Sequence, residues 1–437
     1  MISCATYRSW PSPSLLYLKS EKSEFHVTDV EGSWIVSLYS IGDFVGCLFS
    51  PSLVDRIGRK YTLLVFAIPS LIGCLLITTA NNVNYLFVGR FIGGIGHGGI
   101  FNLIVIYVSE ISEKNIRGIL MNIMNIASNI GTCIFTAIGA YLSYQIYNIT
   151  SITIPILFLA TFIFMPESPY FLLMKNRDND AMASIMKLRG VRNQKSIESE
   201  LTSIKLSITS FRNQKINKSP LRELFSNRNH RRGLFILLCL KATQFLAGKM
   251  VISAYTQEIF GYTDSTLAPE HCVMILGGID FIAGLVVGGV IERFSRKILL
   301  LTSGILTSLC LFICGLFFYL KNQVRLDVTD ISWIPLFGLV VYMFAYTLGI
   351  GTIPYMVLGE IFPISVKGTA VSIGLMMGSI FSFLVTLTYS YVNHFAGIHT
   401  NFWIYAACSF IGAIVNFKLT PETKGKTLEE IQTMLQT

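Results

Sequence analysis

The sequence predicts an all-α protein that crosses a membrane many times and consists of two similar halves. The first observation is composition: of the 437 residues, 52% are hydrophobic and 14% are charged. The mean hydropathy is +0.59, and a water-soluble core could not bury that much apolar surface. The second observation is that the apolar residues form runs of about 20, the length of a helix that spans a bilayer. They lack the alternation of a membrane barrel.

The third observation is that three short polar motifs occur twice, in the same order. The pairs are Asp55–Lys60 with Glu292–Lys297, Glu110–Arg117 with Glu360–Lys367, and Pro166–Pro169 with Pro421–Lys424. Their members are 237, 250 and 255 residues apart. This spacing indicates that the second half of the chain repeats the plan of the first.

The first half, residues 1–165, contains six apolar stretches. Residues Cys4 to Leu18 are short for a span and include Arg8 and two prolines, so we predict a first helix that is truncated at its N-terminus. The acidic stretch Lys19–Gly32 is predicted to be an outside loop. The other predicted helices are Trp34–Val54, Tyr61–Ala80, Tyr85–Val108, Gly118–Tyr141 and Ile149–Met165.

The turn before the last of these helices contains the triplet Asn148-Ile149-Thr150. This triplet is an acceptor for N-glycosylation. The turn carries no charge and is predicted to face the outside, so Asn148 is a predicted glycosylation site.

Residues 166–232 are too polar to enter a bilayer. We predict a cytoplasmic linker with short surface helices at Ser168–Arg189 and Ser196–Ser207. Residues 233–420 are predicted to form the second bundle, and residues 421–437 a cytoplasmic tail. The helices of the second bundle are Gly233–Phe260, Cys272–Ile291, Ile298–Leu320, Trp333–Leu358, Thr369–Val392 and Phe402–Leu419.

The basic residues predict the orientation of the chain. Of the 34 Lys and Arg residues, 26 lie in or next to the loops of one side, four on the other side and four within spans. Cytoplasmic loops of membrane proteins carry this excess. We therefore predict a multi-pass protein of the cell membrane whose two termini are cytoplasmic if the first helix is complete. The net charge of +9 then needs no nucleic acid to explain it.

Several kinds of site are excluded. The nine cysteines form no CxxC pair and no histidine spacing suits a metal, so we predict no cofactor and no metal. No nucleophile, base and orienting residue stand at a workable spacing, so we predict no enzyme activity. The stretch Gly94–Gly99 matches GxGxxG but lies inside an apolar helix, where helix-packing glycines are expected in place of a nucleotide site. His97 within it is expected to be a packed polar residue.

Together these motifs resemble the sugar porter family of the major facilitator superfamily, and within it most of all the insect facilitated trehalose transporters. The resemblance covers nearly the whole chain. It is carried by the two basic loops, Gly89-Arg90-Phe91, Tyr107–Ile111, Pro166–Pro169 and Pro421–Lys426. The resemblance implies the major facilitator fold, in which two six-helix bundles enclose a central cavity that opens to each side in turn. A polar solute needs such a wet site between repeats.

The resemblance also implies that the repeated motifs form a network of gating charges at the cytosolic helix ends. The predicted members are Asp55, Arg59, Glu110 and Arg117 in the first half, and Glu292, Arg296, Glu360 and Lys367 in the second. An exposed ion pair contributes about 1 kcal/mol or less, so several must act together. The alternative is that some of these charges only set the topology. Arg90 resembles the arginine of the family's Gly-Arg motif and is expected to anchor the cytosolic half of the cavity.

The predicted substrate site departs from the family pattern. Asn125 stands where the family has a glutamine in helix five, and Phe245 replaces the second of two glutamines in helix seven. Gln244 remains as the first, and Tyr355 in helix ten retains an aromatic ring that could stack on a sugar. Each hydrogen bond lost from a buried polar group costs about 1–3 kcal/mol. The sequence therefore also allows an altered substrate.

Charges occur within the predicted spans. Lys249 and Asp280 lie in helices seven and eight, and we predict an ion pair between them, because an unpaired charge at the bilayer centre costs at least about 2.5 kcal/mol. The alternative is relaxed constraint in a degenerating copy. Asp43 interrupts helix two, and together with Asp280 it allows a proton-coupled carrier.

We therefore predict a facilitative uniporter that moves a sugar (a hexose, trehalose or a related polyol) by alternating access, without ATP. Its predicted partners are a small sugar-like substrate and the lipid bilayer. Two alternatives stay open. One is a proton-coupled or altered-substrate carrier, and the other is a sugar sensor that does not transport.

Overall fold

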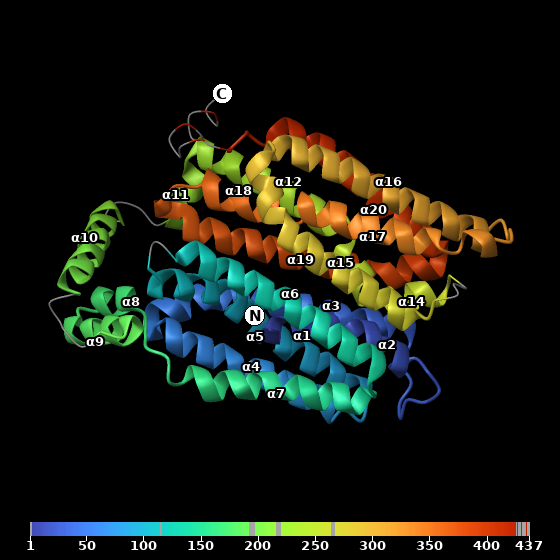
Figure 1. Ribbon diagram of the computed structural model, residues 1–437, viewed down its shortest axis with the longest axis horizontal. Helices are drawn as coiled ribbons and strands as arrows, with labels where there is room; N and C mark the ends of the chain where they lie inside the picture. The colour runs from blue at the N-terminus through green and yellow to red at the C-terminus, as the bar shows by residue number, and fades with distance from the viewer. Residues whose placement is uncertain are drawn as a thin grey trace.

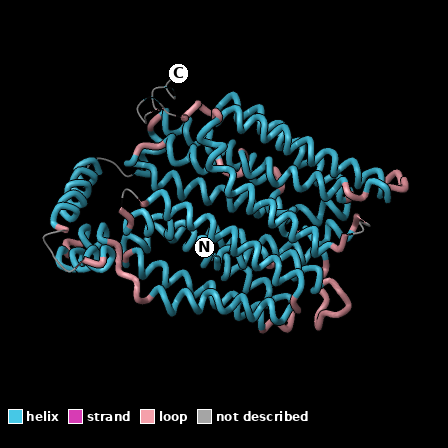
Figure 2. Tube along the Cα trace, in the orientation of Figure 1, coloured by secondary structure: helices cyan, strands magenta, loops and turns pink. Residues whose placement is uncertain are grey.

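The structure is a computed structural model, and it describes residues 2–113, 116–191, 197–215, 220–263 and 267–424, with single positions 426, 430 and 434. The side chains of Arg117, Asn125 and Glu292 are among the few within these ranges that lie outside the description. Every regular element in the described ranges is a helix (Figure 2). The predicted all-α class is confirmed.

The first half of the chain forms one group of helices, coloured blue to teal in Figure 1. Its elements are α1 (Ile2–Ser9), α2 (Pro11–Leu18), α3 (Asp29–Ile57), α4 (Arg59–Thr78), α5 (Val83–Ile111), α6 (Arg117–Tyr141) and α7 (Tyr144–Phe162). Backbone hydrogen bonds continue across the junction of α1 and α2, from Trp10 N to Thr6 O (3.1 Å) and from Ser14 N to Trp10 O (3.3 Å). The two short helices therefore act as one bent first helix.

The second half forms another group, coloured yellow-green to red (Figure 1). Its elements are α12 (Arg228–Leu246), α13 (Lys249–Ala254), α14 (Thr256–Gly261), α15 (Pro269–Arg293), α16 (Arg296–Asn322), η2 (Thr329–Ile331), α17 (Ile334–Leu348), α18 (Ile353–Ile361), α19 (Ile364–Ala396) and α20 (Ile398–Leu419). The two groups meet where α3 packs along α19 and α6 along α15. In the repeat, α3 corresponds to α15 and α6 corresponds to α19. The two contacts are therefore related by the symmetry that the repeat predicts.

The segment between the halves contains short helices, as predicted. They are α8 (Pro169–Met174), α9 (Asp178–Arg189), α10 (Glu198–Lys215) and α11 (Pro220–Ser226), and α8 to α10 lie together at one end of the molecule (Figure 1). The single helix predicted over Ser168–Arg189 is two helices. The chain turns at Asn176, whose φ of 59° lies in the left-handed region that asparagine tolerates.

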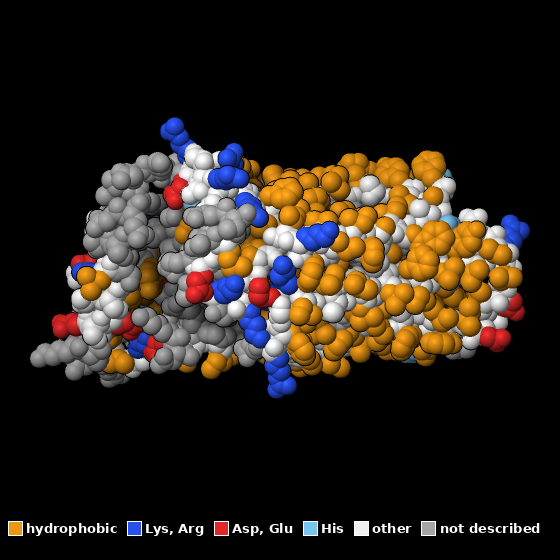
Figure 3. Space-filling model, turned by 90° about the horizontal axis from the view of Figure 1, so that it is seen from above, with side chains coloured by type: hydrophobic (Ala, Val, Ile, Leu, Met, Phe, Trp, Pro, Cys, Tyr) orange, Lys and Arg blue, Asp and Glu red, His pale blue; other side chains and the backbone are white. Residues whose placement is uncertain are grey.

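Ten helical segments in the described part of the chain are long and apolar enough to cross a membrane, and α6 adds the shorter apolar helix Ile126–Tyr141. Figure 3 shows hydrophobic side chains covering most of one lateral face, with charged side chains toward the ends. We call the end of the spans that carries Arg59 and Arg296 the inner end, and the end that carries Lys19 and Glu258 the outer end.

The glycines of α5 are packing residues, as predicted for the stretch Gly94–Gly99. A Cβ on Gly42 or Gly46 of α3 would lie 2.1 or 2.2 Å from a carbonyl oxygen of α5. A Cβ on Gly94 or Gly98 of α5 would lie equally close to a carbonyl of α3. The four-residue spacing on both helices lets the two backbones touch, so a nucleotide has no place there.

Two helices that were predicted to be continuous are broken. The span predicted over Gly233–Phe260 ends its first helix at Leu246, because Gly248 adopts φ +81°, a conformation that suits glycine. A Cβ there would also lie 2.4 Å from the ring of Tyr405. The span predicted over Trp333–Leu358 is interrupted at residues 349–352, between α17 and α18. Broken helices expose backbone groups at the depth where carriers bind their solutes.

The structure corrects the start of the last helix of the first half and, with it, the predicted glycosylation site. α7 begins at Tyr144 and not at Ile149, because the hydroxyl of Ser143 caps its first turn. Asn148 thus lies in the second turn of α7. It is 2% exposed, and its Oδ1 accepts a hydrogen bond from Trp10 Nε1 at 2.7 Å. A glycosyltransferase cannot reach this buried amide, so the predicted site is wrong.

We expect no glycan on Asn148. Endoglycosidase treatment should leave the electrophoretic mobility of the wild-type protein from eukaryotic cells unchanged. The matched control is Glu21→Asn, which creates an acceptor triplet with Lys22 and Ser23 in the exposed loop beside Lys19. That variant should acquire a glycan that the enzyme removes. A mobility shift that Asn148→Gln abolishes would contradict the burial seen here.

Candidate functional site

A ladder of small polar side chains joins the two halves. Ser33 Oγ lies 2.5 Å from Ser390 Oγ, and Ser40 Oγ lies 2.9 Å from Ser382 Oγ. A third rung is formed by Asp43 Oδ2, which accepts from Ser379 Oγ at 2.5 Å. The three rungs run along α3 from its outer end to its middle, because α3 and α19 are antiparallel.

Other contacts between the halves gather at the outer end. Lys19 Nζ lies 2.8 Å from Glu258 Oε2 and 2.6 Å from Asp29 Oδ1, and Tyr141 OH lies 2.7 Å from His271 Nδ1. From Asp43 to the inner end of α3, the described residues of α3 and α19 form no further hydrogen bond with each other. The halves are thus joined by polar contacts from the outer end to mid-depth.

The third rung of the ladder includes a histidine that the sequence analysis assigned to packing alone. His97 Nδ1 lies 2.5 Å from Asp43 Oδ1, so the carboxylate bridges His97 of α5 and Ser379 of α19. The imidazole is 4% exposed and lies between the rings of Tyr39 and Phe101. Among the described residues of α3 and α19, this cluster is the polar link farthest from the outer end.

The predicted ion pair of Lys249 and Asp280 is present. Lys249 Nζ lies 2.6 Å from Asp280 Oδ1, and the same oxygen accepts from Thr347 Oγ1 at 2.9 Å. The pair joins α13, α15 and α17 at the break of the seventh span. Lys249 and Asp280 are 21% and 29% exposed, so solvent reaches the pair while its charges stay matched.

Gln244 is not free to bind a solute in this conformation. Its Nε2 donates to Gly351 O at 2.7 Å and its Oε1 accepts from Lys241 Nζ at 2.9 Å, so both ends of the amide are occupied. Lys241 Nζ in turn lies 3.4 Å from the centroid of the Tyr355 ring. Tyr355 is 39% exposed and interacts electrostatically with Arg8 and Asp43 of the first half. In this conformation Gln244 supports Lys241 and the break at Gly351, and its contact with a solute stays a prediction.

Phe245 fills the space that Gly378 leaves. A Cβ on Gly378 would lie 2.7 Å from the phenylalanine ring, so the large residue in α12 and the small one in α19 are complementary. Phe245 is half-buried. The side chain of the other predicted contact, Asn125, lies outside the described residues.

The charges of the first half form a compact lock at the inner end. Arg59 donates from Nε and Nη2 to the two oxygens of Glu110, both at 2.8 Å, and the Ser168 hydroxyl bonds to the same carboxylate. Glu167 Oε1 accepts from the backbone N–H of Arg59 and Lys60 at 2.9 and 3.1 Å. This carboxylate thus caps the positive end of α4.

The second half repeats this lock with matching residues. Arg296 forms an ion pair with Glu360 and donates from Nη1 to Thr423 Oγ1 at 2.7 Å. Glu422 accepts from the backbone N–H of Arg296 at 3.3 Å and from the Ser295 hydroxyl. Glu422 caps α16 as Glu167 caps α4. The roles of both glutamates were not predicted from the sequence, although their place in the repeated Pro-Glu motif was the available signal.

The other predicted gating residues are not part of these locks. Asp55 is exposed and Lys367 is half-buried, and neither forms an ion pair with a described residue. The side chains of Arg117 and Glu292 lie outside the described residues. Both locks connect helices of one half only, so each holds its own bundle together at the inner end.

The structure corrects the predicted position of Arg90. Its Nε donates to Ile35 O at 3.1 Å and its Nη1 donates to Tyr7 O at 2.9 Å. The guanidinium also lies 4.6 Å from the centroid of the Tyr39 ring and is 1% exposed. Arg90 follows Val83 by two turns at the outer end of α5. It therefore joins α1, α3 and α5 in the outer half of the first bundle and does not anchor the cytosolic half of a cavity.

We expect the cap on α16 to make stability depend on pH. Burial alone would raise the pKa of Glu422. Hydrogen bonds from the Ser295 hydroxyl and the backbone N–H of Lys424, Lys297 and Arg296 outweigh burial, so its pKa lies below the ordinary value. A lowered pKa adds stability above the carboxyl's unfolded pKa of about 4.3, and that stability is lost as pH falls through the folded pKa.

The measurement is the thermal unfolding midpoint of the purified protein at pH values from 7 down to 3. Below about pH 4.3 the unfolding temperature of the wild type should fall further than that of the Glu422→Gln variant, because the variant has no titrating carboxyl at this position. At pH 7 the variant should be less stable, by about 0.3–1 kcal/mol for a charge at a helix N-terminus. Parallel curves for the two proteins would contradict the assignment.

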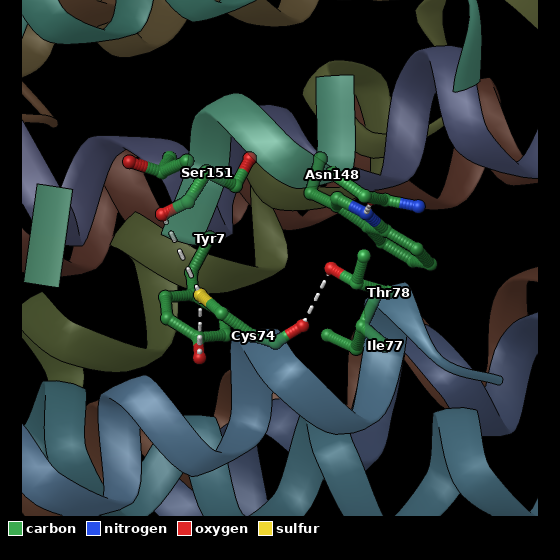
Figure 4. Close-up of a pocket in the computed structure, with 8 residues that line it drawn as sticks. Tyr7, Cys74, Ile77, Thr78, Asn148 and Ser151 are labelled. Carbon is green, nitrogen blue, oxygen red and sulfur yellow. Dashed lines mark hydrogen bonds between the residues drawn. The ribbon is translucent and has the colours of Figure 1, made fainter. Parts of the chain in front are cut away.

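A small space lies inside the first bundle, between α1, α4 and α7 (Figure 4). Its volume is about 10 Å³, and Tyr7, Cys74, Asn148 and Ser151 are among its lining residues. Cys74 Sγ lies 3.2 Å from Tyr7 OH and 3.8 Å from Ser151 O. A space of this size holds at most one water molecule, so it is not a solute site.

Known proteins resemble this chain over nearly its whole length. The family profile described as "Sugar (and other) transporter" matches residues 9–435. The facilitated trehalose transporter Tret1 of Apis mellifera ligustica is 33% identical over 426 residues, which are 97% of this chain and 84% of that protein. Tret1 of Anopheles gambiae is 31% identical over 425 residues, 97% of this chain. The chain spans only about half of the Anopheles protein, 53% of its length.

Solved structures show the same fold. The xylose transporter XylE from E. coli in its inward open conformation superimposes with a TM-score of 0.80, covering 99% of this chain and 97% of that one at 20% identity. A partially occluded inward open conformation of XylE also superimposes with a TM-score of 0.80, at 19% identity. The predicted fold of two six-helix bundles is confirmed.

Proposed function

The chain belongs to the sugar (and other) transporter family, and from this premise we propose that it moves a sugar or related polyol across a membrane by alternating access, as a uniporter. The observation that carries the proposal is the arrangement of its polar contacts. The links between the halves run from the outer end to the Asp43–Ser379 rung, whereas each inner lock stays within one half. Opening the outer end then requires breaking the ladder while both bundles stay intact.

We assign the solute to the region between the halves at mid-depth. There Tyr355 supplies an exposed ring, Phe245 supplies an apolar wall, and the pair of Lys249 and Asp280 supplies polar atoms. Asn125 is a further proposed contact from α6. In this scheme Gln244 orders the site through Lys241 and Gly351, and the two locks hold the inner helix ends during the cycle.

We further propose the cell membrane as the location, with both termini in the cytoplasm. The concentration of basic residues at the inner end supports this orientation. The proposed divisions are a first bundle at residues 1–165, a linker at 166–232, a second bundle at 233–420 and a tail at 421–437. The lipid bilayer and a small sugar-like solute are the proposed partners.

The test is uptake of radiolabelled glucose, trehalose, xylose and inositol into vesicles that contain the purified protein. At least one of these solutes should enter faster than into empty vesicles. Tyr355→Ala should reduce that uptake strongly, because stacking on an aromatic face is lost. The matched control is Tyr391→Ala, since Tyr391 is also 39% exposed but lies near the outer end of α19. Equal uptake by both variants would contradict the assigned site.

A proton-coupled carrier is the second candidate, and the Asp43, His97 and Ser379 cluster favours it. This cluster connects two titratable groups to a contact between the halves, so protonation and opening are linked there. An imposed pH gradient should then drive uptake against the solute gradient. If the solute concentration inside the vesicles never exceeds the concentration outside under any pH gradient, proton coupling is excluded and the carrier is a uniporter. Stabilisation by a sugar that is never taken up would identify the sensor instead.

A further inference from the structure

Among the described residues, the charges at mid-depth between the two halves do not balance. Two described carboxylates, Asp43 and Asp280, face this mid-depth region, and both are already engaged. Asp43 Oδ1 lies 2.5 Å from His97 Nδ1 and its Oδ2 accepts from Ser379 at 2.5 Å. Asp280 Oδ1 lies 2.6 Å from Lys249 Nζ. Each carboxylate therefore has a cationic or titratable partner of its own.

Arg8 is the charge that this pairing leaves over. Its side chain is exposed, although α1 is enclosed by the first bundle, and its guanidinium carbon lies 5.7 Å from the centroid of the Phe101 ring. With the described residues Arg8 forms neither a hydrogen bond nor an ion pair. It interacts electrostatically with Tyr39 and Asp43 of its own half, and with Tyr355, Lys241 and Asp280 of the other half. The guanidinium thus faces the region assigned to the solute.

Lys241 is a second cation without a carboxylate. It is 1% exposed. Among the described residues, its Nζ contacts the amide oxygen of Gln244 (2.9 Å) and the face of the Tyr355 ring (3.4 Å to the centroid). Neither partner carries a negative charge. Arg8 and Lys241 repel each other, and an anion between the halves would reduce this repulsion while gaining attraction to both.

The geometry selects a particular kind of anion. Only Arg8 is accessible to a solute, because Lys241 is covered by Tyr355. A guanidinium offers parallel N–H donors that match the two oxygens of a carboxylate. A doubly charged phosphate would bring excess negative charge close to Asp43 and Asp280. The exposed ring of Tyr355 beside Arg8 suits the apolar face of a sugar.

We propose that the solute of this site is a sugar acid, a sugar ring or polyol that bears one carboxylate, with the carboxylate bound by Arg8 and the ring packed on Tyr355. This inference rests on the proposed function and specifies the substrate class of the same site. It also accounts for the hydrogen-bonding groups missing from helix seven, because one charged contact replaces several neutral ones.

The experiment compares uptake of D-glucuronate and D-glucose, which differ only in whether C6 is a carboxylate or a hydroxymethyl group. Vesicles contain the wild type, Arg8→Gln, Arg8→Lys or Lys22→Gln. Lys22 is exposed in the loop outside the spans, so its variant removes one positive charge elsewhere. Binding is followed in parallel as thermal stabilisation of the purified proteins by each solute. Arg8→Gln removes an unpaired charge, so the fold should be retained, and its midpoint of unfolding is measured first.

We expect the wild type to take up glucuronate at least about tenfold faster than glucose, a factor that corresponds to one charged contact of about 1.4 kcal/mol. Arg8→Gln should lose this preference, Arg8→Lys should keep part of it, and Lys22→Gln should equal the wild type. Uptake of glucose at an equal or higher rate would overturn the inference and leave the proposed function intact. Glucose 6-phosphate is tested as a third solute. If it enters faster than glucuronate, the inference that the bound group is a carboxylate is wrong. If no solute enters or stabilises the protein, both proposals fail.

Discussion

Oxidation of a Ser40→Cys, Ser382→Cys double variant should abolish solute uptake, with a loss of about tenfold or more, because the linked helices can no longer separate. The two hydroxyls lie 2.9 Å apart in the middle of the ladder, one in each half, and both residues are buried there. A covalent bond at this position holds the outer ends together. A carrier locked in one conformation cannot complete a cycle, whatever its affinity for the solute.

The measurement is uptake into vesicles before oxidation, after oxidation and after reduction with a thiol. Reduction should restore the rate to that of the untreated variant. Each single variant, oxidised in the same way, should keep its uptake, which controls for the nine native cysteines. Full activity of the oxidised double variant, with the crosslink verified by peptide mapping, would exclude separation of α3 from α19 as a step in transport.

Replacing Lys249 by methionine should lower the free energy of unfolding by about 3 kcal/mol, the cost of leaving a buried carboxylate without its cation. The value is taken at the lower end of the usual range, because Lys249 and Asp280 are 21% and 29% exposed and water screens part of the charge. Thr347 still donates to Asp280, so one hydrogen bond remains. The thermal unfolding midpoint in detergent measures this loss.

The double variant Lys249→Met, Asp280→Asn should recover most of the lost stability, because neither charge then remains. The matched control is Arg177→Met, which breaks the ion pair with Asp180 on α9. Those side chains are 59% and 54% exposed, and such pairs contribute at most about 0.5 kcal/mol. If the double variant is no more stable than Lys249→Met alone, the pair is not the source of the stability.

Four members of the inner locks were among the eight gating charges that the resemblance implied, and their repetition in the sequence marked them. Arg59 with Glu110, and Arg296 with Glu360, stand in short polar segments between long apolar ones. A charge at the end of a span lies beside the apolar membrane, so its nearest suitable partner is an opposite charge at the end of a neighbouring span. The pair of Lys249 and Asp280 followed from similar reasoning, since each is costly in a bilayer without the other.

The errors share a different cause. Asn148 was placed by its distance from a predicted turn and Arg90 by its resemblance to a family motif, and the structure places both elsewhere. Asn148 lies within α7 because Ser143 caps that helix earlier than expected. The indole N–H of Trp10, between α1 and α2, donates to the side-chain amide oxygen of Asn148. Arg90 donates to backbone carbonyls of α1 and α3, and no sequence pattern in α5 predicts these contacts.

The sequence by itself determined that the chain is a duplicated bundle of membrane-spanning helices with its basic loops on one side. Those properties depend on hydropathy and on local charge, and both act along the chain. Only the tertiary structure decided which polar groups stay available between the halves. It paired Gln244 with Lys241, and Asp43 with His97 and Ser379, and it left Arg8 without a hydrogen bond or ion pair to a described residue. Hydrogen bonds between helices distant in sequence depend on packing that no linear pattern encodes.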